Sequence, residues 1–384
     1  MIRPTPDFVV IANPAGRRVS LFQQALAGLG LPPARVVPWL DLLEGRARLE
    51  DVVCPGSVVR VESPGQDFEV EKALLAVGAD VPDDPGPTRL SRAAIERLTF
   101  DRGRILCPRQ WYLGFRAALA MIERRLAGCP PHVLMAHPAD VALMFDKPCC
   151  QVLLAAAGVP VPPALGPVRS YEELCARMKE TGRRRVFVKL AHGSSASGVV
   201  AYQTDGVREL AITSVEMTGS AGEPRLYNSR NIRRYQRRDE IAALIDAVAR
   251  ERVQVEQWVP KAGLDGQAFD LRVLVIAGRP RHTVVRLSHN PMTNLHLKNR
   301  RGDVGEVRRR TGEEAWEEAM ATCRRAVAVF PRSLCAGIDL AITPGFRRHA
   351  VLETNAFGDL LPGIVDDGDD SYTAQVREMM SGCA

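Results

Sequence analysis

Short apolar segments of strand type alternate with segments of helical periodicity along this chain, and this alternation limits its fold more than any other feature. FVVIAN at 8–13 predicts a buried strand, and RVVPWL, SVVRVE and VLMA are further strand candidates. Helical patterns lie between them, after Ser91 and from Leu113 to Leu126. Such alternation predicts an α/β fold, in which helices cover a sheet.

The apolar runs are all short, which argues against a membrane-spanning helix. None approaches the roughly 20 residues that a bilayer requires, and the first apolar stretch is too short for a signal peptide. We therefore expect a cytoplasmic protein with no membrane partner. The nine cysteines include no C-x-x-C pair, so a disulfide framework or a zinc site is not expected.

Arginine has replaced lysine almost everywhere, because only 6 of the 51 basic residues are lysines. A retained lysine is therefore a candidate for a position that needs a compact point charge. Arginine pairs recur along the chain, whose 51 basic and 45 acidic residues give a formal charge of +6. No aromatic residues are interleaved with these pairs, so we expect solvated faces rather than a nucleic-acid interface.

Prolines and changes in the predicted secondary structure divide the chain into three blocks. We expect an N-terminal α/β domain at 1–145, a central subdomain at 146–254 and a C-terminal subdomain at 255–384. The central block opens with Asp146-Lys147-Pro148 and a short apolar helix. Prolines at 160, 162 and 163 then end the helical pattern.

Capping signals predict where three later helices begin. Ser170 and Glu173 form a capping box before the helix that runs through Lys179. Asp239 is a predicted N-cap, and Thr311 with Glu314 predicts a second capping box. A polar loop at 288–303 separates the strands of the third block from its helix.

The last two predicted strands, GIDLAI and HAVLETN, are joined by Pro344-Gly345 and carry three oxygen-bearing side chains. Glu353 and Asn355 lie two apart and so share a face of their strand. A hairpin partner brings Asp339 beside them. Such a set suits Mg²⁺, which takes phosphate oxygens and waters as its other ligands. The alternative interpretation is a polar hairpin end.

A second candidate site follows the predicted strand VFVKL. The strand delivers Lys189, and the turn after it contains Gly193, Ser194, Ser195 and Ser197. Small residues let backbone N–H groups approach a phosphate closely. The turn is not a Walker A loop, because no Gly-Lys-Ser/Thr occurs. By itself it is also consistent with an ordinary hairpin.

The third block adds a hinge and several cations. The strand VEQWV leaves a domain joint, where its backbone could meet an adenine edge. Asp270 and Arg272 share a face of the next strand, Arg286 lies on the strand after it, and Asn294 and His296 lie in the loop beyond. Arginine can grip phosphate or carboxylate with two hydrogen bonds. His296 and Arg272 each have an ordinary structural interpretation as well.

The order of these segments, more than any one of them, resembles the ATP-grasp superfamily, in particular its ribosomal-protein glutamate ligases and glutathione synthetase-like carboxylate-amine ligases. The resemblance covers about 140–360, and it implies an ATP-grasp fold behind an N-terminal preceding domain. It also implies roles for individual residues. These are Lys147, Lys189 and the turn with Gly193, Ser194, Ser195 and Ser197 for the ATP phosphates; Glu256, Gln257, Trp258 and Val259 for adenine; Arg272, Arg286, Asn294 and His296 near the γ-phosphate and acyl group; and Asp339, Glu353 and Asn355 for magnesium.

The chain departs from the family pattern in the loop after Asn294. Asn294-Leu295-His296 is followed by Lys298-Asn299-Arg300-Arg301 instead of paired glycines. The acidic ribose partner is not evident either, and Asp265 is our only candidate.

The resemblance implies an ADP-forming ligase that activates a carboxylate as an acyl-phosphate with Mg-ATP and joins it to an amine. One or two Mg²⁺ ions are expected, with Mn²⁺ as an alternative metal. The substrates are a small-molecule or peptide carboxylate and an amine. Two alternatives remain: a hydroxyl kinase on the same fold, with His296 or Asp270 as base, and a non-catalytic ATP-binding regulatory protein.

Overall fold

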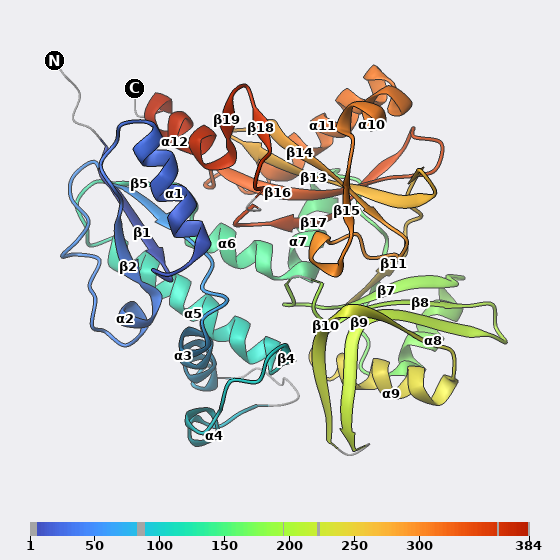
Figure 1. The fold of residues 1–384 in the computed structure, drawn as a ribbon. Helices are drawn as coiled ribbons and strands as arrows, with labels where there is room; N and C mark the ends of the chain where they lie inside the picture. The colour runs from blue at the N-terminus through green and yellow to red at the C-terminus, as the bar shows by residue number, and fades with distance from the viewer. Residues whose placement is uncertain (1–5, 83–88, 195, 221–222, 359–360, 383–384) are drawn as a thin grey trace.

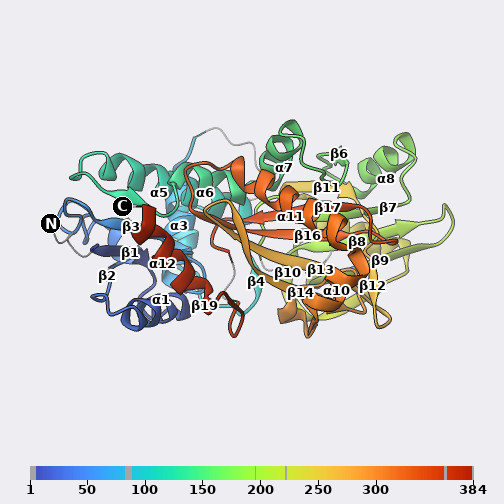
Figure 2. The same ribbon diagram turned by 90° about the horizontal axis from the view of Figure 1, so that it is seen from above.

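The computed structural model describes residues 6–82, 89–194, 196–220, 223–358 and 361–382 of the chain. Figure 1 shows three main sheets: an N-terminal sheet with its helices, a central sheet, and a C-terminal sheet above the central one. Seen from above, the N-terminal sheet lies at one end, and the other two overlap at the opposite end (Figure 2). Within the described ranges, no helix combines the length and apolar character needed to cross a membrane.

The N-terminal sheet is parallel, with strand order β2-β1-β3-β5. Its strands are β1 (Phe8–Ala12), β2 (Arg35–Pro38), β3 (Val58–Val61) and β5 (Val133–Leu134). All of β1 is buried, as expected for a parallel strand covered on both faces. Phe8 and Val10 pack on one side and Val9 and Ile11 on the other. The covering helices are α1 (Arg17–Gly28) and α12 (Ser371–Gly382) on the first side, and α3 (Phe68–Ala79) and α5 (Pro108–Leu126) on the second.

Helices α3 and α5 cross with their backbones in close contact. A Cβ at Gly78 would lie 2.0 Å from the Gln110 carbonyl oxygen, and one at Gly114 would lie 1.8 Å from that of Leu74. Only glycine fits at this crossing. The remaining helices of this region are α2 (Trp39–Leu43), α4 (Arg92–Glu96) and α6 (Pro138–Phe145).

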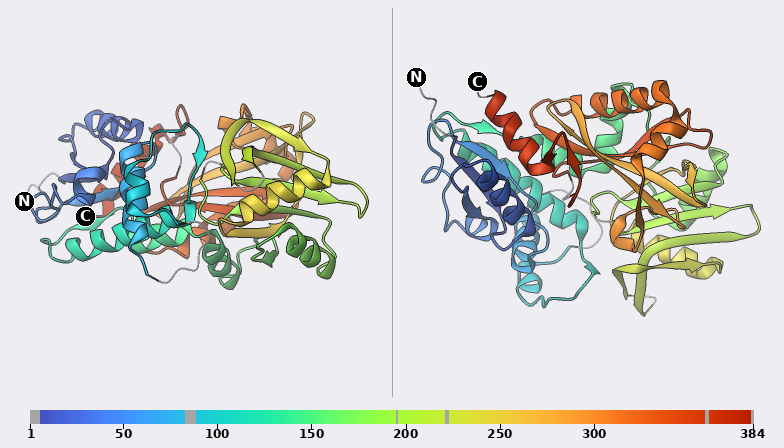
Figure 3. Two further views of the ribbon diagram at one scale, coloured as in Figure 1. Left: turned by 90° about the horizontal axis from the view of Figure 1, so that it is seen from below. Right: turned by 45° about the horizontal axis from the view of Figure 1, so that its top comes forward.

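The central sheet has the order β4-β10-β9-β8-β7-β11-β6. Its strands are β4 (Arg104–Ile105), β6 (Ala164–Gly166), β7 (Arg185–Leu190), β8 (Val199–Thr204), β9 (Glu209–Ser220), β10 (Glu223–Tyr235) and β11 (Val253–Gln257). Helices α8 (Tyr171–Glu180) and α9 (Arg238–Ala249) cover the face that points away from the C-terminal sheet (Figure 3). Strand β4 comes from the first block of the sequence, so the boundary expected at 145 does not separate the two sheets completely.

The C-terminal sheet has the order β15-β14-β13-β16-β17, with β12 paired to β13. Its strands are β12 (Gly263–Leu264), β13 (Gln267–Ile276), β14 (Arg279–Ser288), β15 (Arg300–Gly302), β16 (Cys335–Ile342) and β17 (His349–Asn355). The other elements of this region are α7 (Lys147–Ala156), α10 (Val304–Thr311), α11 (Glu313–Ala328), the 3₁₀ turn η1 (Leu295–Leu297), and the short pair β18 (Val365–Asp366) and β19 (Asp369–Asp370).

The sequence predicts most of these elements, and the α/β class is confirmed. The N-cap at Ser170 is also confirmed, because its hydroxyl accepts a hydrogen bond from the Glu173 N–H at 3.1 Å. The Glu173 carboxylate accepts from the Arg169 N–H at 2.9 Å and not from the Ser170 N–H that a full capping box uses. The N-cap prediction for Asp239 is wrong: helix α9 begins after Arg237, whose side chain Asp239 binds instead. The box at Thr311 is wrong too, since its hydroxyl donates to the Val307 carbonyl at the end of α10.

Candidate active site

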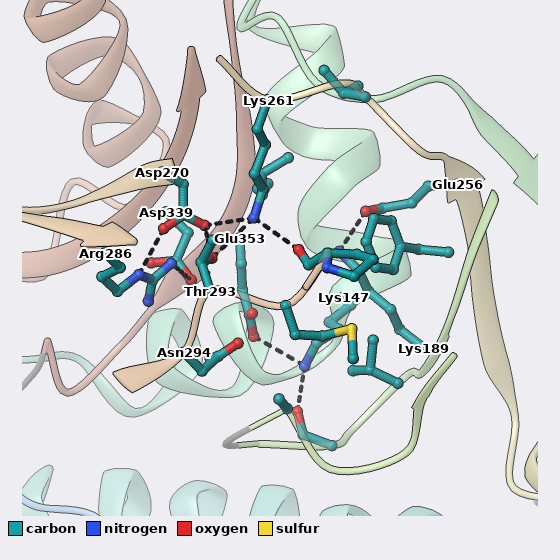
Figure 4. A pocket seen from close by; sticks show the side chains of 18 of the residues that line it. Lys147, Lys189, Glu256, Lys261, Asp270, Arg286, Thr293, Asn294, Asp339 and Glu353 are labelled. Carbon is teal, nitrogen blue, oxygen red and sulfur yellow. Dashed lines mark hydrogen bonds and ion pairs between the residues drawn. The ribbon is translucent and has the colours of Figure 1, made fainter. Parts of the chain in front are cut away.

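An open pocket lies between the central and C-terminal sheets and encloses about 710 Å³, counted with the solvent at its mouth. Its charged residues point toward one another from both sheets and from the start of α7 (Figure 4). The lining residues that carry charge are Lys147, Lys189, Glu256, Lys261, Asp270, Arg286, Asp339 and Glu353. Apolar walls come from Phe187, Leu190, Val199, Val259, Met292 and Leu352, among others.

The C-terminal hairpin brings the predicted metal ligands together. Strands β16 and β17 pair with Asp339 opposite Glu353 and Gly337 opposite Asn355. Asp339 and Glu353 line the pocket, whereas the Asn355 amide donates a 3.4 Å hydrogen bond to the Gly337 carbonyl. Two carboxylates are therefore placed side by side, with the amide behind them.

Asp339 is buried between two arginines. Its Oδ1 lies 2.5 Å from Arg272 Nε and its Oδ2 lies 3.1 Å from Arg286 Nη2. Burial raises the pKa of Asp339, and the two guanidinium groups oppose that rise. Asp339 thus presents its carboxylate directly opposite that of Glu353 on the neighbouring strand. Two carboxylates this close, on the wall of one pocket, form an oxygen donor set that fits a divalent cation.

The two predicted phosphate-binding lysines reach the pocket from neighbouring segments, the start of α7 and strand β7. Lys147 begins α7, where Asp146 caps the helix. Its Nζ lies 3.1 Å from Glu353 Oε1 and also donates to the Gly193 carbonyl. Lys189 on β7 forms a buried ion pair with Glu256. Although burial alone would raise the pKa of Glu353, both lysines hold it below its ordinary value.

The turn after β7 has the close packing that its small residues predict. Gly198 has a φ of +66°, and a Cβ there would lie 2.2 Å from Leu190 Cδ1. Gly193 and Ser197 line the pocket. Ser194 is exposed, and the prediction for Ser195 lies outside the described residues. The turn therefore presents part of the predicted set to the pocket.

Three of the four residues of the predicted adenine hinge line the pocket, namely Glu256, Gln257 and Val259. The fourth, Trp258, packs its ring on Phe187 with centroids 5.3 Å apart. The Gln257 N–H donates to Pro163 and the Trp258 N–H to Arg185. Those two N–H groups are thus occupied, which leaves the Gln257 carbonyl and the Val259 backbone as the candidates for an adenine contact.

A buried charge network occupies the wall opposite the turn. Asp270 accepts a 2.7 Å hydrogen bond from Arg286 and a 2.9 Å bond from Lys261. Lys261 also donates to the Thr293 hydroxyl at 2.9 Å. Despite burial, the Arg286 and Lys261 charges hold the pKa of Asp270 well below its ordinary value. Asp270 is therefore an ionised hydrogen-bond acceptor whose partners are already in place.

Lys261 is the main residue that sequence reasoning missed. It lines the pocket and is largely buried, and burial lowers its pKa while Asp270 opposes that shift. A signal for it existed, because it is one of only six lysines in the chain. Lys261 lies just after the predicted hinge and close to Asp265 in the chain.

Several predicted residues lie outside the described lining of the pocket. Arg272 is buried behind Asp339. Asp265 lies in the exposed turn between β12 and β13, and His296 is exposed on η1. Asn294, in contrast, does line the pocket. The ribose role of Asp265 and the acyl-site role of His296 therefore receive no support from their positions.

No protein-family model matches this sequence, and no curated protein matches it either. Solved structures do match over nearly the whole chain. The ATP-grasp ligase PsnB complexed with a minimal precursor is 16% identical, with 98% of this chain and 99% of that chain covered and a TM-score of 0.54. The D-cycloserine synthetase DcsG is 15% identical, with 97% and 99% covered and a TM-score of 0.56.

A third structure is the macrocyclase MdnC bound with precursor peptide MdnA from Microcystis aeruginosa MRC. It is 12% identical, with 98% of this chain and 99% of that chain covered and a TM-score of 0.52. Identities this low establish a fold and not a substrate. The chain has the ATP-grasp fold, as the order of its motifs implied.

Proposed function

We propose that this chain binds Mg-ATP in the pocket between its two larger sheets and uses the γ-phosphate to activate a carboxylate for attack by an amine. One observation carries the proposal. The ammonium groups of Lys147, Lys189 and Lys261 and the Arg286 guanidinium converge on the pocket that also holds Asp339 and Glu353. Cationic side chains recognise phosphate and carboxylates bind the metal, so a site for Mg-ATP requires both in one pocket.

The residues of the hairpin fit a magnesium ion. Asp339 and Glu353 would hold it, with Asn355 as a neutral third ligand after release from Gly337. Among the described residues, no three His, Cys, Asp or Glu side chains gather closely enough to hold a metal on their own. Phosphate oxygens and waters would complete the shell, as magnesium prefers. When bound, the ion would offset charge on the phosphates.

The reaction balances without a protein nucleophile. A carboxylate oxygen attacks the γ-phosphorus as the bond to ADP breaks, giving an acyl-phosphate. The amine nitrogen then attacks the acyl carbon, phosphate leaves with its electron pair, and the amine proton passes to phosphate or solvent. Two like unit charges 4 Å apart repel by about 4 kcal/mol at an effective dielectric of 20. The lysines and Arg286 lower this repulsion for the incoming anion.

Neither of the two bases considered for the hydroxyl-kinase alternative, Asp270 and His296, is suited to that role. Asp270 is held ionised, with a lowered pKa, by Arg286 and Lys261, so it accepts a proton poorly. His296 is exposed and lies outside the pocket lining. A non-catalytic regulatory protein would be favoured if a metal ligand had been lost from the pocket. Both candidate carboxylate ligands, Asp339 and Glu353, are present and lie opposite each other on the hairpin.

The carboxylate is proposed to be a small molecule or a peptide side chain. PsnB and MdnC have been solved with precursor peptides, and DcsG is a D-cycloserine synthetase. Peptide carboxylates and small-molecule carboxylates are therefore both the first to test. The assay is substrate-dependent ADP release from Mg-ATP with pooled carboxylates, peptides and amines. ADP release that depends on both a carboxylate and an amine supports the ligase. Tight ATP binding with no turnover in any pool supports the regulatory protein.

A further inference from the structure

A buried histidine lies at the start of the turn after β7, residues 193–198, which we call the phosphate turn. Its side chain contacts the N-terminal region. His192 directly precedes Gly193 and is 4% exposed. Its ring stacks on that of Tyr112, from helix α5, with centroids 3.9 Å apart and planes 4° from parallel. The turn of the central sheet is thus packed against a helix of the N-terminal region.

The hydrogen bonds of His192 define its tautomer. One ring nitrogen, Nδ1, lies 3.3 Å from the Phe145 carbonyl oxygen, and the other, Nε2, lies 2.9 Å from Arg109 Nη1. A carbonyl only accepts and a guanidinium only donates. The ring must therefore carry its hydrogen on Nδ1 and offer its lone pair at Nε2. Burial and the Arg109 charge agree with this neutral form, since they lower the pKa of His192 well below its ordinary value.

The peptide groups on either side of His192 are held as well. The Lys147 N–H donates to the Ala191 carbonyl at 3.1 Å, and Lys147 Nζ donates to the Gly193 carbonyl. The Ala191 N–H donates to the Arg252 carbonyl at 2.9 Å. The start of the turn is therefore fixed by groups from α5, from the end of α6 and from Lys147.

A second, independent contact ties the same two regions together. Strand β4 extends the central sheet, with Ile105 opposite Leu226 and Arg104 opposite Tyr227 on β10. The Asn228 N–H also donates to the Gly103 carbonyl at 2.7 Å. Residues 103–112 thus hold the central sheet at two places, one of which is the phosphate turn.

We propose that His192 is a positioning residue through which helix α5 holds the phosphate turn in its binding conformation. This proposal rests on the proposed function, because it assigns the turn to the ATP phosphates. A turn that occupies its binding conformation for only a tenth of the time binds its ligand about tenfold more weakly. Loss of the stack should accordingly raise the Kd for Mg-ATP by about tenfold or more and leave the other site residues in place.

Tyr112 allows a test that does not alter the turn itself. Tyr112→Ala removes the stack, whereas Tyr112→Phe keeps it and loses only the hydroxyl bond to the Ala142 carbonyl. The measurement is calorimetric binding of a non-hydrolysable Mg-ATP analogue to both variants and to His192→Ala. We expect Tyr112→Ala and His192→Ala to bind about tenfold more weakly than the parent, with Tyr112→Phe unchanged.

Amide exchange of residues 191–194 without nucleotide gives a second measurement. We expect faster exchange in Tyr112→Ala than in Tyr112→Phe. Equal nucleotide affinities, or equal exchange in these two variants, would overturn the positioning role. If His192→Ala does not fold, the Tyr112 pair still decides. If the parent binds no nucleotide, the proposed function fails, and the exchange comparison decides the anchoring by itself.

Discussion

The buried pair of Lys189 and Glu256 gives the sharpest test of how the pocket is built. Their side chains are 13% and 2% exposed, whereas those of Lys147 and Glu353 are 14% and 29% exposed. In Lys189→Met the aliphatic volume remains but Glu256 keeps a buried, unpaired charge. Breaking a buried pair in this way costs about 3–5 kcal/mol of unfolding free energy.

The same loss should be smaller for Lys147→Met, because water reaches Glu353. The double variant Lys189→Met/Glu256→Gln removes both charges and should recover most of the stability. It should not recover nucleotide binding, which loses a charge-assisted phosphate contact worth about 1.5–3 kcal/mol. Stability and affinity thus separate in one pair of variants.

Denaturant unfolding and calorimetric titration with Mg-ATP measure the two quantities. We expect the single variant to lose about 3–5 kcal/mol, the double variant to lose much less, and both to bind nucleotide weakly. A single variant as stable as the parent would contradict the burial argument. A double variant that binds Mg-ATP like the parent would remove Lys189 from the phosphate site.

Three further predictions use other residues. Glu353→Gln should fold and bind ATP but turn over poorly, because one carboxylate charge at the metal is lost; unimpaired turnover would argue against the metal site. Lys147→Ala should weaken ATP binding by titration, whereas Lys179→Ala, on the exposed side of α8, should not; equal affinities would remove Lys147 from the site. Burial raises the pKa of Glu251 to about 7. The folded state therefore binds a proton more tightly than the unfolded state. The stability that this proton contributes is fully present below the unfolded pKa and is lost as pH rises through 7. Glu251→Gln should therefore gain up to roughly 3 kcal/mol over the parent between pH 4 and pH 8.5 in unfolding experiments, and a pH-independent difference would contradict the burial of its carboxylate.

The sequence predicts those helices and strands whose pattern of apolar and polar residues reflects which of their faces are buried. Strand β1 reads as a continuous apolar run because both faces are covered. The hairpin of β9 and β10 was missed because it has no such pattern. Both Ala211 and Ile212 of β9 are buried, so no alternation appears, and β10 carries arginines along its length. Tertiary contacts, not local pattern, place these two strands.

The site shows a similar division. Asp339 and Glu353 could be found from strand periodicity and a short turn, since both are local. Lys261 and Asp270 could not be paired from spacing, because their contact depends on how β12, β13 and the 288–303 loop fold together. Nor could the stack of His192 on Tyr112 be predicted, since it joins two regions far apart in the chain. The capping predictions are wrong at Asp239, whose carboxylate binds the Arg237 side chain, and at Thr311, whose hydroxyl donates to the Val307 backbone carbonyl.

Hydroxylamine trapping tests the central claim most directly. Hydroxylamine is a small nucleophile that intercepts an acyl-phosphate even when the natural amine is unknown. With a carboxylate or peptide pool and Mg-ATP, we predict a hydroxamate formed in equal amount with ADP, without AMP, and in much smaller amount when Glu353→Gln replaces the parent. Formation of AMP and pyrophosphate, or of a phosphorylated alcohol with no hydroxamate, would contradict γ-phosphate activation of a carboxylate in this pocket.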